Sequence, residues 1–331
     1  MASDSLQVPT RDDVQAAAQR IKPYVARTPV LRSDALDRLA GASLFCKAEC
    51  LQITGSFKIR GATNRLVRVK QELGDKDIVA FSSGNHAQGV ARAARWLDLK
   101  ATIVMPKTAP SVKIDGVKAD GAVIRLYDPE MESREEIGAQ IAKDTGAVLV
   151  PSFDDPYIVA GQGTVGLELL EQVSALNGQL DALICCTGGG GLVSGISLAF
   201  GDAETEIWTA EPNGHDDWAR SLSEGQTIRN EPGVRSICDA ILTPTPGDIP
   251  WHIGRDRFAG GDTVSDDQVM AAMKLAFRHL KVVLEPGGAV ALAAALFSSK
   301  RKRTGQRIGV ILSGGNVDPD MFVRALGVND P

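Results

Sequence analysis

The sequence predicts an α/β fold in which parallel sheets are flanked by helices. Apolar runs of strand length recur along the chain, and helical patterns separate them. Continuous runs of valine, isoleucine and leucine are typical of parallel strands, because the connecting helices bury both faces of the sheet. Ligands of such folds bind beyond the carboxyl ends of the strands. Three glycine-containing stretches, at 54–62, 82–89 and 188–191, follow predicted strands in this way.

The predicted elements follow each other along the whole chain. A helical pattern at 12–24 comes first, and Ser33 is expected to cap a short helix that ends at Gly41. Strands are expected at 44–49, 78–81, 101–105, 122–126, 147–150, 182–186, 206–210 and 308–312. Helices are expected at 62–73, 86–97, 111–119, 133–144, 164–176, 192–200 and 266–281. The stretch 230–260 has no clear pattern, and an irregular segment of that length is usually functional or flexible.

Length and composition exclude several classes of function. The chain has 331 residues, 44% hydrophobic and 23% charged, which is typical of a globular protein with a large core. A net charge of −5 offers no surface for nucleic acid, and the basic run at 300–303 is expected to be a solvated helix end. The chain shows neither a membrane span nor a signal sequence. Five cysteines, mainly in apolar runs, predict reduced thiols and a cytoplasmic protein.

The stretch at 54–62 places a lysine where a strand gives way to a helix. Lys58 lies between glycines and next to Phe57. A lysine held in such a turn can be desolvated, and its neutral amine can then attack a carbonyl to form a Schiff base. A single lysine in a capped turn is more often a solvated surface residue. The interpretation therefore depends on the other two stretches.

The stretches at 82–89 and 188–191 also lie between a strand and a helix. The first reads Ser-Ser-Gly-Asn-His-Ala-Gln-Gly, and the second consists of four glycines. Successive backbone N–H groups at a helix N-terminus form a cradle for an anion. No Gly-Lys-Ser/Thr follows, so the cradle is not a P-loop. The Gly-x-Gly-x-x-Gly at 161–166 is not a dinucleotide fingerprint either, because a turn precedes it instead of a strand.

In this order, the three stretches resemble those of fold type II pyridoxal-phosphate enzymes. Within that group the chain is similar to the serine/threonine dehydratase and serine racemase family, which includes 3-hydroxyaspartate dehydratases. The resemblance extends from about residue 21 to 317. It implies a tryptophan synthase β-like architecture, with a large cofactor-binding domain at 1–70 and 155–331 and a small mobile domain at 71–154. It also implies an active site in the cleft between the domains, a homodimer, and no C-terminal regulatory domain.

The resemblance implies roles for individual residues. Lys58 would hold pyridoxal 5′-phosphate through its amine and then act as the base at the substrate Cα. The other cofactor-binding residues would be Phe57, Asn85, Gly188, Gly189, Gly190, Gly191, Leu192 and Ser313, with the Ser313 hydroxyl at the pyridine nitrogen. The substrate would be held by Ser82, Ser83, Asn85, Gln88 and Arg134. Ser83 would lie on the face of Cα opposite the lysine, where racemisation needs a second proton donor.

Some of these residues have a structural alternative. Ser313 could cap a helix before Val317, and His86 is expected to be structural. Arg134 could form a surface ion pair with Asp128 or Glu130. An arginine at a helix start is unfavourable for the helix dipole, however, which favours a functional role. In the cleft its guanidinium would bind the distal carboxylate of a dicarboxylic substrate through two parallel hydrogen bonds.

The loop after the predicted strand 206–210 resembles a cation-binding loop of the racemase-like branch. The resemblance implies three ligands, namely Glu211, the backbone carbonyl of His215, and Asp217. Such an all-oxygen set suits Mg²⁺, with Ca²⁺ or Mn²⁺ as alternatives. The structural alternative is a solvated acidic loop.

These expectations together favour a pyridoxal-phosphate-dependent ammonia-lyase that acts on a small β-hydroxy amino acid. Its products would be a keto acid and ammonia, formed through an enamine and an imine. The leading substrates are 3-hydroxyaspartate and then L-threonine and L-serine. One alternative is an amino-acid racemase with side elimination, which shares every motif. The less favoured alternative is a non-catalytic amino-acid sensor, which would have no need of Lys58 or Ser313.

Overall fold

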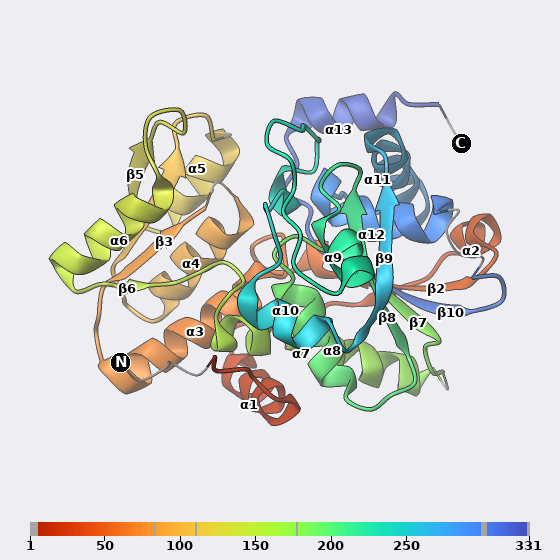
Figure 1. The fold of residues 1–331 in the computed structure, drawn as a ribbon, viewed down its shortest axis with the longest axis horizontal. Coiled ribbons are helices and arrows are strands. Elements are labelled where there is room, and N and C mark those ends of the chain that lie inside the picture. Colours follow the sequence, from red (N-terminus) through yellow and green to blue (C-terminus); the bar gives the residue numbers. More distant parts are fainter. Residues whose placement is uncertain (1–5, 83, 110, 177, 299–302, 330–331) are drawn as a thin grey trace.

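Two sheets of mainly parallel strands, each covered by its own helices, make up the fold (Figure 1). The computed structural model describes residues 6–329 apart from 83, 110, 177 and 299–302. The expected fold class, α/β with helices flanking parallel sheets, is confirmed. Every strand expected from an apolar run is present within two residues of its expected bounds.

The large sheet has six strands in the order β1-β2-β10-β7-β8-β9. Their bounds are Val30–Leu31 for β1, Ser43–Ala48 for β2, Arg307–Leu312 for β10, Ala182–Cys186 for β7, Glu206–Pro212 for β8 and Phe258–Val264 for β9. All neighbours pair in parallel except β1, which is antiparallel to β2. The segment that joins β1 to β2 contains the short helix α2 (Asp34–Ala40).

Helices bury both faces of the large sheet, as continuous apolar strands require. Leu183 and Cys185 of β7 pack in one core with α7 (Pro156–Ala175) and α8 (Gly191–Phe200). Ile184 and Cys186 pack in another core with α11 (Asp266–Leu280) and α12 (Pro286–Phe297). Consecutive residues of one strand thus belong to different cores because strand side chains alternate between faces.

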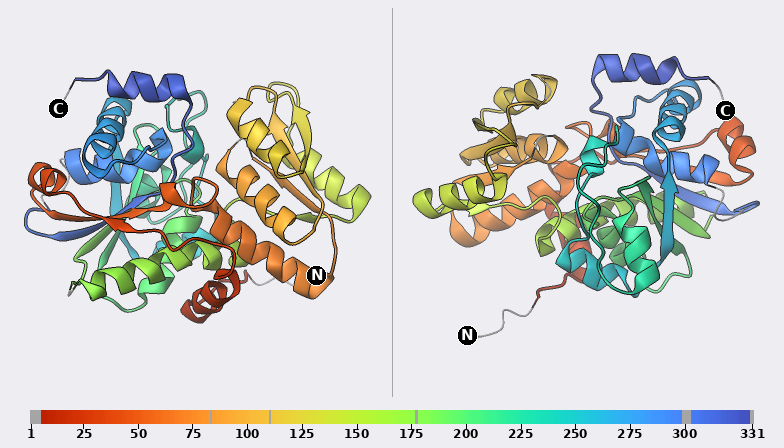
Figure 2. Two further views of the ribbon diagram at one scale, coloured as in Figure 1. Left: turned by 180° about the vertical axis from the view of Figure 1, so that it is seen from behind. Right: turned by 45° about the horizontal axis from the view of Figure 1, so that its top comes forward.

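The small sheet has four parallel strands in the order β5-β4-β3-β6, all inside the segment 71–154 (Figure 2). Their bounds are Val123–Tyr127 for β5, Ala101–Pro106 for β4, Ile78–Phe81 for β3 and Val148–Leu149 for β6. The helices of this part are α3 (Lys58–Leu73), α4 (Asn85–Trp96), α5 (Ser111–Ala119) and α6 (Arg134–Thr145). Side chains of β3 and β4 pack against α3 and α4 on one face and against α6 on the other.

The glycine motif at 161–166 lies inside α7, which rules out a dinucleotide-binding loop. A Cβ atom on Gly161 would lie 2.7 Å from the Cα atom of Gly61 in α3. A Cβ atom on Gly163 would lie 2.5 Å from the carbonyl oxygen of Gly195 in α8. The glycines therefore allow α7 to pack closely against both helices, as expected for a packing motif.

The remaining elements are α1 (Arg11–Ile21), α2 (Asp34–Ala40), η1 (Glu49–Leu51), α9 (Asp217–Glu224), η2 (Asp239–Ile241), α10 (Asp248–Gly254) and α13 (Pro319–Leu326). Ser33 is the N-cap of α2 and Gly41 is its C-cap, as expected, although the Ser33 side chain accepts no capping hydrogen bond. The irregular stretch at 230–260 contains η2, α10 and the start of β9. No helix in the described part of the chain is long and apolar enough to cross a membrane.

Two predictions about single side chains have different outcomes. All five cysteines lie among the described residues, and each is buried and unpaired, as expected. Arg303, in contrast, is not a solvated helix end: it is buried, and its guanidinium lies 2.7 Å from Asp262. The rest of that basic run, 300–302, lies outside the described residues. An acidic partner on β9 therefore decides the environment of Arg303.

Candidate active site

A cavity of about 400 Å³ brings the three predicted stretches together. It is lined by residues that follow β3, β7 and β10, and by the start of α3. The predicted site residues that line it are Phe57, Lys58, Ser82, Asn85, Arg134, Gly188, Gly189, Gly190, Gly191, Leu192 and Ser313. Gln88 is not part of this lining, and Ser83 lies outside the described residues.

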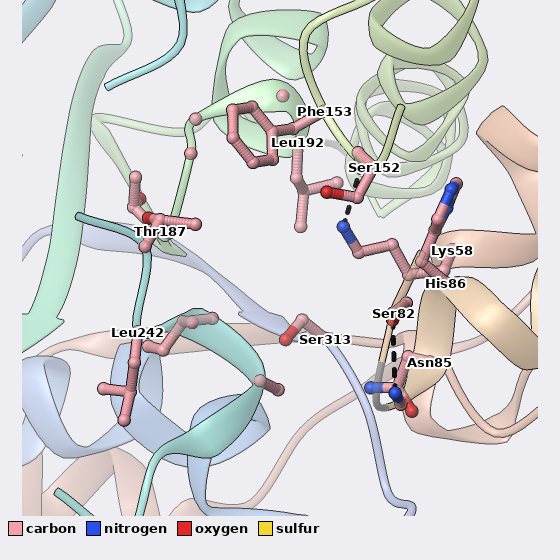
Figure 3. A pocket seen from close by; sticks show the side chains of 18 of the residues that line it. Lys58, Ser82, Asn85, His86, Ser152, Phe153, Thr187, Leu192, Leu242 and Ser313 are labelled. Carbon is pink, nitrogen blue, oxygen red and sulfur yellow. Dashed lines mark hydrogen bonds between the residues drawn. The ribbon is translucent and has the colours of Figure 1, made fainter. Parts of the chain in front are cut away.

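Lys58 is the first residue of α3, and its side chain reaches into this cavity (Figure 3). The amine donates a hydrogen bond of 2.9 Å to the carbonyl oxygen of Ser152. Burial lowers the pKa of Lys58 to about 8, although the Glu285 carboxylate acts in the opposite direction. Burial likewise lowers the pKa of His86 to about 3, so this imidazole is neutral and remains bonded to the Val150 carbonyl. A lowered pKa of this kind favours the neutral form of the Lys58 amine, which is the form that a Schiff-base lysine needs.

The turn before Lys58 is held against the end of β10. Ser56 and Gly314 form an isolated antiparallel bridge, and the Phe57 N–H donates to the Ser313 carbonyl at 3.1 Å. These backbone bonds place Lys58 and Ser313 in one cavity although they are far apart in the sequence. Because these bonds join backbone groups, they position both residues whatever their side chains are.

A buried ion network behind the turn holds α3 in place. Arg60 donates to both oxygens of Glu49, at 2.7 and 2.8 Å, and to both oxygens of Glu168, at 2.7 and 3.0 Å. Lys47 lies 2.6 Å from Glu168. Arg60 and Glu49 are fully buried, and the two carboxylates raise the pKa of Arg60 against the effect of burial. The network connects the helix that begins at Lys58 to β2, η1 and α7.

The four glycines form a cradle that has no room for larger side chains. Gly190 adopts a φ of +92° and is the N-cap of α8. A Cβ atom on Gly189 would lie 2.4 Å from the ring of Phe153, and one on Gly190 would lie 2.1 Å from Trp218. The N–H groups of Gly188, Gly189 and Gly190 donate no backbone hydrogen bond within the described chain. Free N–H groups at a helix N-terminus fit a phosphate, so the residues present fit the phosphate of pyridoxal 5′-phosphate.

Ser313 directly follows β10 and lines the cavity beside the thiol of Cys186. Its structural alternative, a helix cap, is excluded because α13 begins only at Pro319 and has Asp318 as its N-cap. Phe57 lines the same cavity, with its ring centroid 5.2 Å from the Lys58 amine. A ring placed between these groups would therefore meet an aromatic face and a hydroxyl.

The loop after β3 provides neutral hydrogen-bonding groups. Ser82 faces the cavity, and its hydroxyl accepts a hydrogen bond of 3.1 Å from the Gly84 N–H. Asn85 donates to Glu285 and accepts a bond of 2.7 Å from Asn316. Gln88 accepts from the same Asn316 amide at 3.3 Å, behind the cavity. Asn316 therefore holds Asn85 in place from behind, and direct contact between Gln88 and a substrate stays a prediction.

Arg134 is the first residue of α6 and contributes to the cavity wall. Its Nε atom donates to Glu135 at 2.8 Å, and its guanidinium lies 5.5 Å from the ring centroid of Phe81. The expected alternative partners, Asp128 and Glu130, form no ion pair with it in the described chain. Its two terminal nitrogens donate no hydrogen bond to any described residue. These terminal nitrogens form the fork that binds a carboxylate with two bonds.

Sequence reasoning missed five charged residues that line the cavity, namely Lys113, Glu135, Asp154, Asp239 and Glu285. Burial raises the pKa of Glu285 to about 7, while Lys113 and Asn85 act in the opposite direction. A carboxylate at the end of an apolar run, before Pro286, was the available signal for Glu285. Lys113 and Asp239 stand in stretches with no comparable signal.

Glu211 and Asp217 lie together beside the start of α9, and both are buried. Glu211 accepts hydrogen bonds of 2.9 Å from the N–H groups of Trp218 and Ala219. Burial raises the pKa of Asp217 to about 7, and burial together with Asp217 raises the pKa of Glu211 well above its ordinary range. One oxygen of Asp217 has no hydrogen-bond partner in the described chain. The solvated acidic loop is therefore excluded.

Comparisons with known proteins agree with this geometry. The family of pyridoxal-phosphate dependent enzymes matches residues 21–314. The chain is 41% identical over 315 residues to a β-hydroxyaspartate dehydratase of Paracoccus denitrificans, covering 95% of this chain and 98% of the relative. It is 42% identical over 311 residues to a serine racemase of Arabidopsis thaliana, covering 92% of each. The structure of maize serine racemase matches with a TM-score of 0.90 and 40% identity over 97% of both chains. The chain therefore belongs to the pyridoxal-phosphate dependent enzyme family.

Proposed function

We propose that this enzyme is an ammonia-lyase that dehydrates β-hydroxy amino acids, with 3-hydroxyaspartate as its preferred substrate. The proposal is carried by the two terminal nitrogens of Arg134, which donate no hydrogen bond to a described residue and lie in the same cavity as the Lys58 amine. Relatives named L-threo-3-hydroxyaspartate ammonia-lyase, from Pseudomonas and Saccharomyces cerevisiae, are 41% and 42% identical to this chain. Serine racemases are equally similar, so the preference for a dicarboxylic substrate rests on Arg134.

The residues of the cavity divide the work of the reaction. Bound pyridoxal phosphate supplies an electron-withdrawing ring, which makes the Cα proton of an attached amino acid easier to remove. The glycine cradle and the Leu192 N–H would hold the phosphate, Phe57 and Asn85 would flank the ring, and the Ser313 hydroxyl would meet the ring nitrogen. Lys58 carries the cofactor and then takes the Cα proton, because its lowered pKa favours the neutral amine. The β-hydroxyl leaves as water by taking up the proton that was removed from Cα, and the enamine that results becomes an imine and is hydrolysed to a keto acid and ammonia.

Racemisation is the competing activity, and it requires one proton donor, Ser83, that elimination does not require. Removal and return of the Cα proton on opposite faces requires a donor on each face. Lys58 serves one face, and the family resemblance assigns Ser83 to the other. Elimination needs only the Lys58 face. We therefore assign Ser83 to racemisation of serine as a side activity.

A divalent cation at Glu211 and Asp217 is part of the proposal. The supporting observations are two buried carboxylates and an oxygen of Asp217 that lacks a partner. Burying two neighbouring carboxylates is costly, and a hard cation offsets that cost. The His215 carbonyl would complete the protein ligands, with Mg²⁺ as the first choice and Ca²⁺ or Mn²⁺ as alternatives.

The assembly, location and division of the chain are also proposed. A homodimer is supported by exposed apolar side chains at Leu51, Ile53 and Val283. The two segments that carry them are neighbours, because Gly315 lies against both Cys50 and Val283. Unpaired cysteines support a reducing, cytoplasmic location. The small sheet with its helices supports the mobile domain proposed at 71–154.

The function is tested with a panel of hydroxy amino acids, by measuring ammonia, keto acid and enantiomer ratio in the same reaction. The expected result is ammonia and keto acid in equal amounts, with the highest kcat/KM for 3-hydroxyaspartate. Preference for threonine would contradict the proposed substrate. Racemisation without ammonia would contradict the ammonia-lyase assignment and favour the racemase.

A further inference from the structure

An ion pair connects the two halves of the fold across the cavity. Lys113 belongs to α5, beside the small sheet, and Asp239 belongs to η2, in the stretch between α9 and α10. The Lys113 amine donates a hydrogen bond of 2.9 Å to one oxygen of Asp239. The Lys113 side chain is only 6% exposed, whereas that of Asp239 is 53% exposed. Both residues line the cavity.

The Lys113 amine also lies next to the loop that follows β3. A Cβ atom built on Gly84 would lie 3.5 Å from its Nζ atom. Burial disfavours the charge, but the carboxylates of Asp239, Glu285 and Asp318 outweigh burial and raise the pKa of Lys113. The amine is therefore an ammonium with three donor positions, of which Asp239 takes one in the described chain.

The α-carboxylate of the substrate still lacks an assigned positive partner in the cavity. Every amino acid brings an α-carboxylate, and a carboxylate that leaves water needs an opposite charge as well as hydrogen bonds. In the loop after β3, Ser82, Gly84 and Asn85 offer hydroxyl, backbone and amide groups, and His86 is neutral. Among the described residues that line the cavity, the cationic side chains are Lys58, Lys113 and Arg134. Lys58 is committed to the cofactor, and Arg134 is proposed for a distal carboxylate.

We propose that Lys113 is a further substrate-binding residue, whose ammonium holds the α-carboxylate against the 82–85 loop. Asp239 is a positioning residue that keeps the ammonium directed at the cavity from the other half of the fold. This inference rests on the proposed function for its substrate class, but it applies to any amino acid that the enzyme binds. It differs from the role of Arg134 because α-carboxylate binding is shared by monocarboxylic and dicarboxylic substrates.

Lys113→Met and Asp239→Asn both break the ion pair, so together they separate binding from a merely structural link. Lys113→Met should raise KM about ten- to hundredfold for serine, threonine and 3-hydroxyaspartate alike, with a much smaller effect on kcat. Lys113→Arg should recover most of the loss. Asp239→Asn keeps the ammonium and should raise KM far less. Equal increases in KM for Lys113→Met and Asp239→Asn, or a Lys113→Met loss confined to kcat, would overturn the inference.

A binding measurement keeps this test independent of the dehydratase activity. Glycine and glycinamide differ in the carboxylate, and their binding to the holoenzyme is followed through the visible absorbance of the cofactor. The wild type should prefer glycine, and Lys113→Met should lose that preference while its melting temperature and cofactor content show that it is folded and loaded. If Lys113→Met still prefers glycine to the same degree, the inference is wrong even if the dehydratase is confirmed. If the preference disappears, the inference holds even if the preferred substrate is a different amino acid.

Discussion

Replacing Arg60 by methionine is expected to destabilise the fold by about 3–5 kcal/mol, the usual cost of leaving a buried charge without its partner. Methionine keeps an apolar stem of similar length but removes the guanidinium. Glu49 is fully buried and would lose both of its bonds to Arg60, retaining only the Thr28 hydroxyl. Glu168 is less affected, because its carboxylate is partly exposed and keeps Lys47. Most of the cost therefore arises at Glu49.

The chain offers a matched control for this experiment. Arg27 and Glu171 form an ion pair of 2.9 Å, but both side chains are more than half exposed. Arg27→Met should cost at most about 1 kcal/mol, because water and salt screen an exposed pair. The double variant Arg60→Met/Glu49→Gln removes both buried charges and should recover part of the stability lost by Arg60→Met alone.

The assay is urea denaturation of the three variants and the wild type, with cofactor content measured on the same samples. Because α3 begins at Lys58, two residues before Arg60, the loosened helix should also weaken cofactor retention by Arg60→Met. If Arg60→Met were no less stable than Arg27→Met, the network would not hold α3, and the reasoning would be refuted. A double variant that is less stable than Arg60→Met would show that the cost does not arise at Glu49.

Five further predictions concern the site. Arg134→Ala should lower kcat/KM for 3-hydroxyaspartate about ten- to hundredfold and spare serine; an equal loss for both would contradict the distal-carboxylate role. Lys58→Ala should abolish turnover without unfolding, and borohydride should trap the cofactor on Lys58 and on no other lysine. Cofactor uptake by the apoenzyme should accelerate as pH rises through about 8, because the buried Lys58 amine is neutral above its lowered pKa; a midpoint near that of an ordinary lysine would contradict this. Ser83→Ala should suppress serine racemisation far more than elimination of the L-enantiomer, so equal losses would argue against separate proton donors on the two faces. Chelation should lower the melting temperature, and Mg²⁺ should restore it through Glu211 and Asp217; a melting temperature that chelator leaves unchanged would remove the cation from the proposal.

Most of the residues expected at the cofactor line one cavity, and they could be predicted because their signals are local. Lys58 and the glycines at 188–191 stand at strand-to-helix turns, where the residue types within a few positions limit the possible backbone conformation. The cradle and the lysine can therefore be located in the sequence without knowing how they lie relative to each other. The substrate-binding residues are harder to predict from the sequence, because Gln88 belongs to the same motif as Asn85 but contacts Asn316 behind the cavity.

The sequence by itself determined the alternation of strands and helices and the three loops that meet at the cavity, because side-chain periodicity and turn chemistry depend on neighbouring residues. Only the tertiary structure decided which charges meet. Arg303 looked like part of a solvated basic run but is buried against Asp262, and Lys113 joins Asp239 across the cavity. Ion pairs between distant segments depend on how whole helices and strands pack. Burial decides whether water screens a charge or whether the charge needs an ionic partner, and the local sequence pattern does not show which residues are buried.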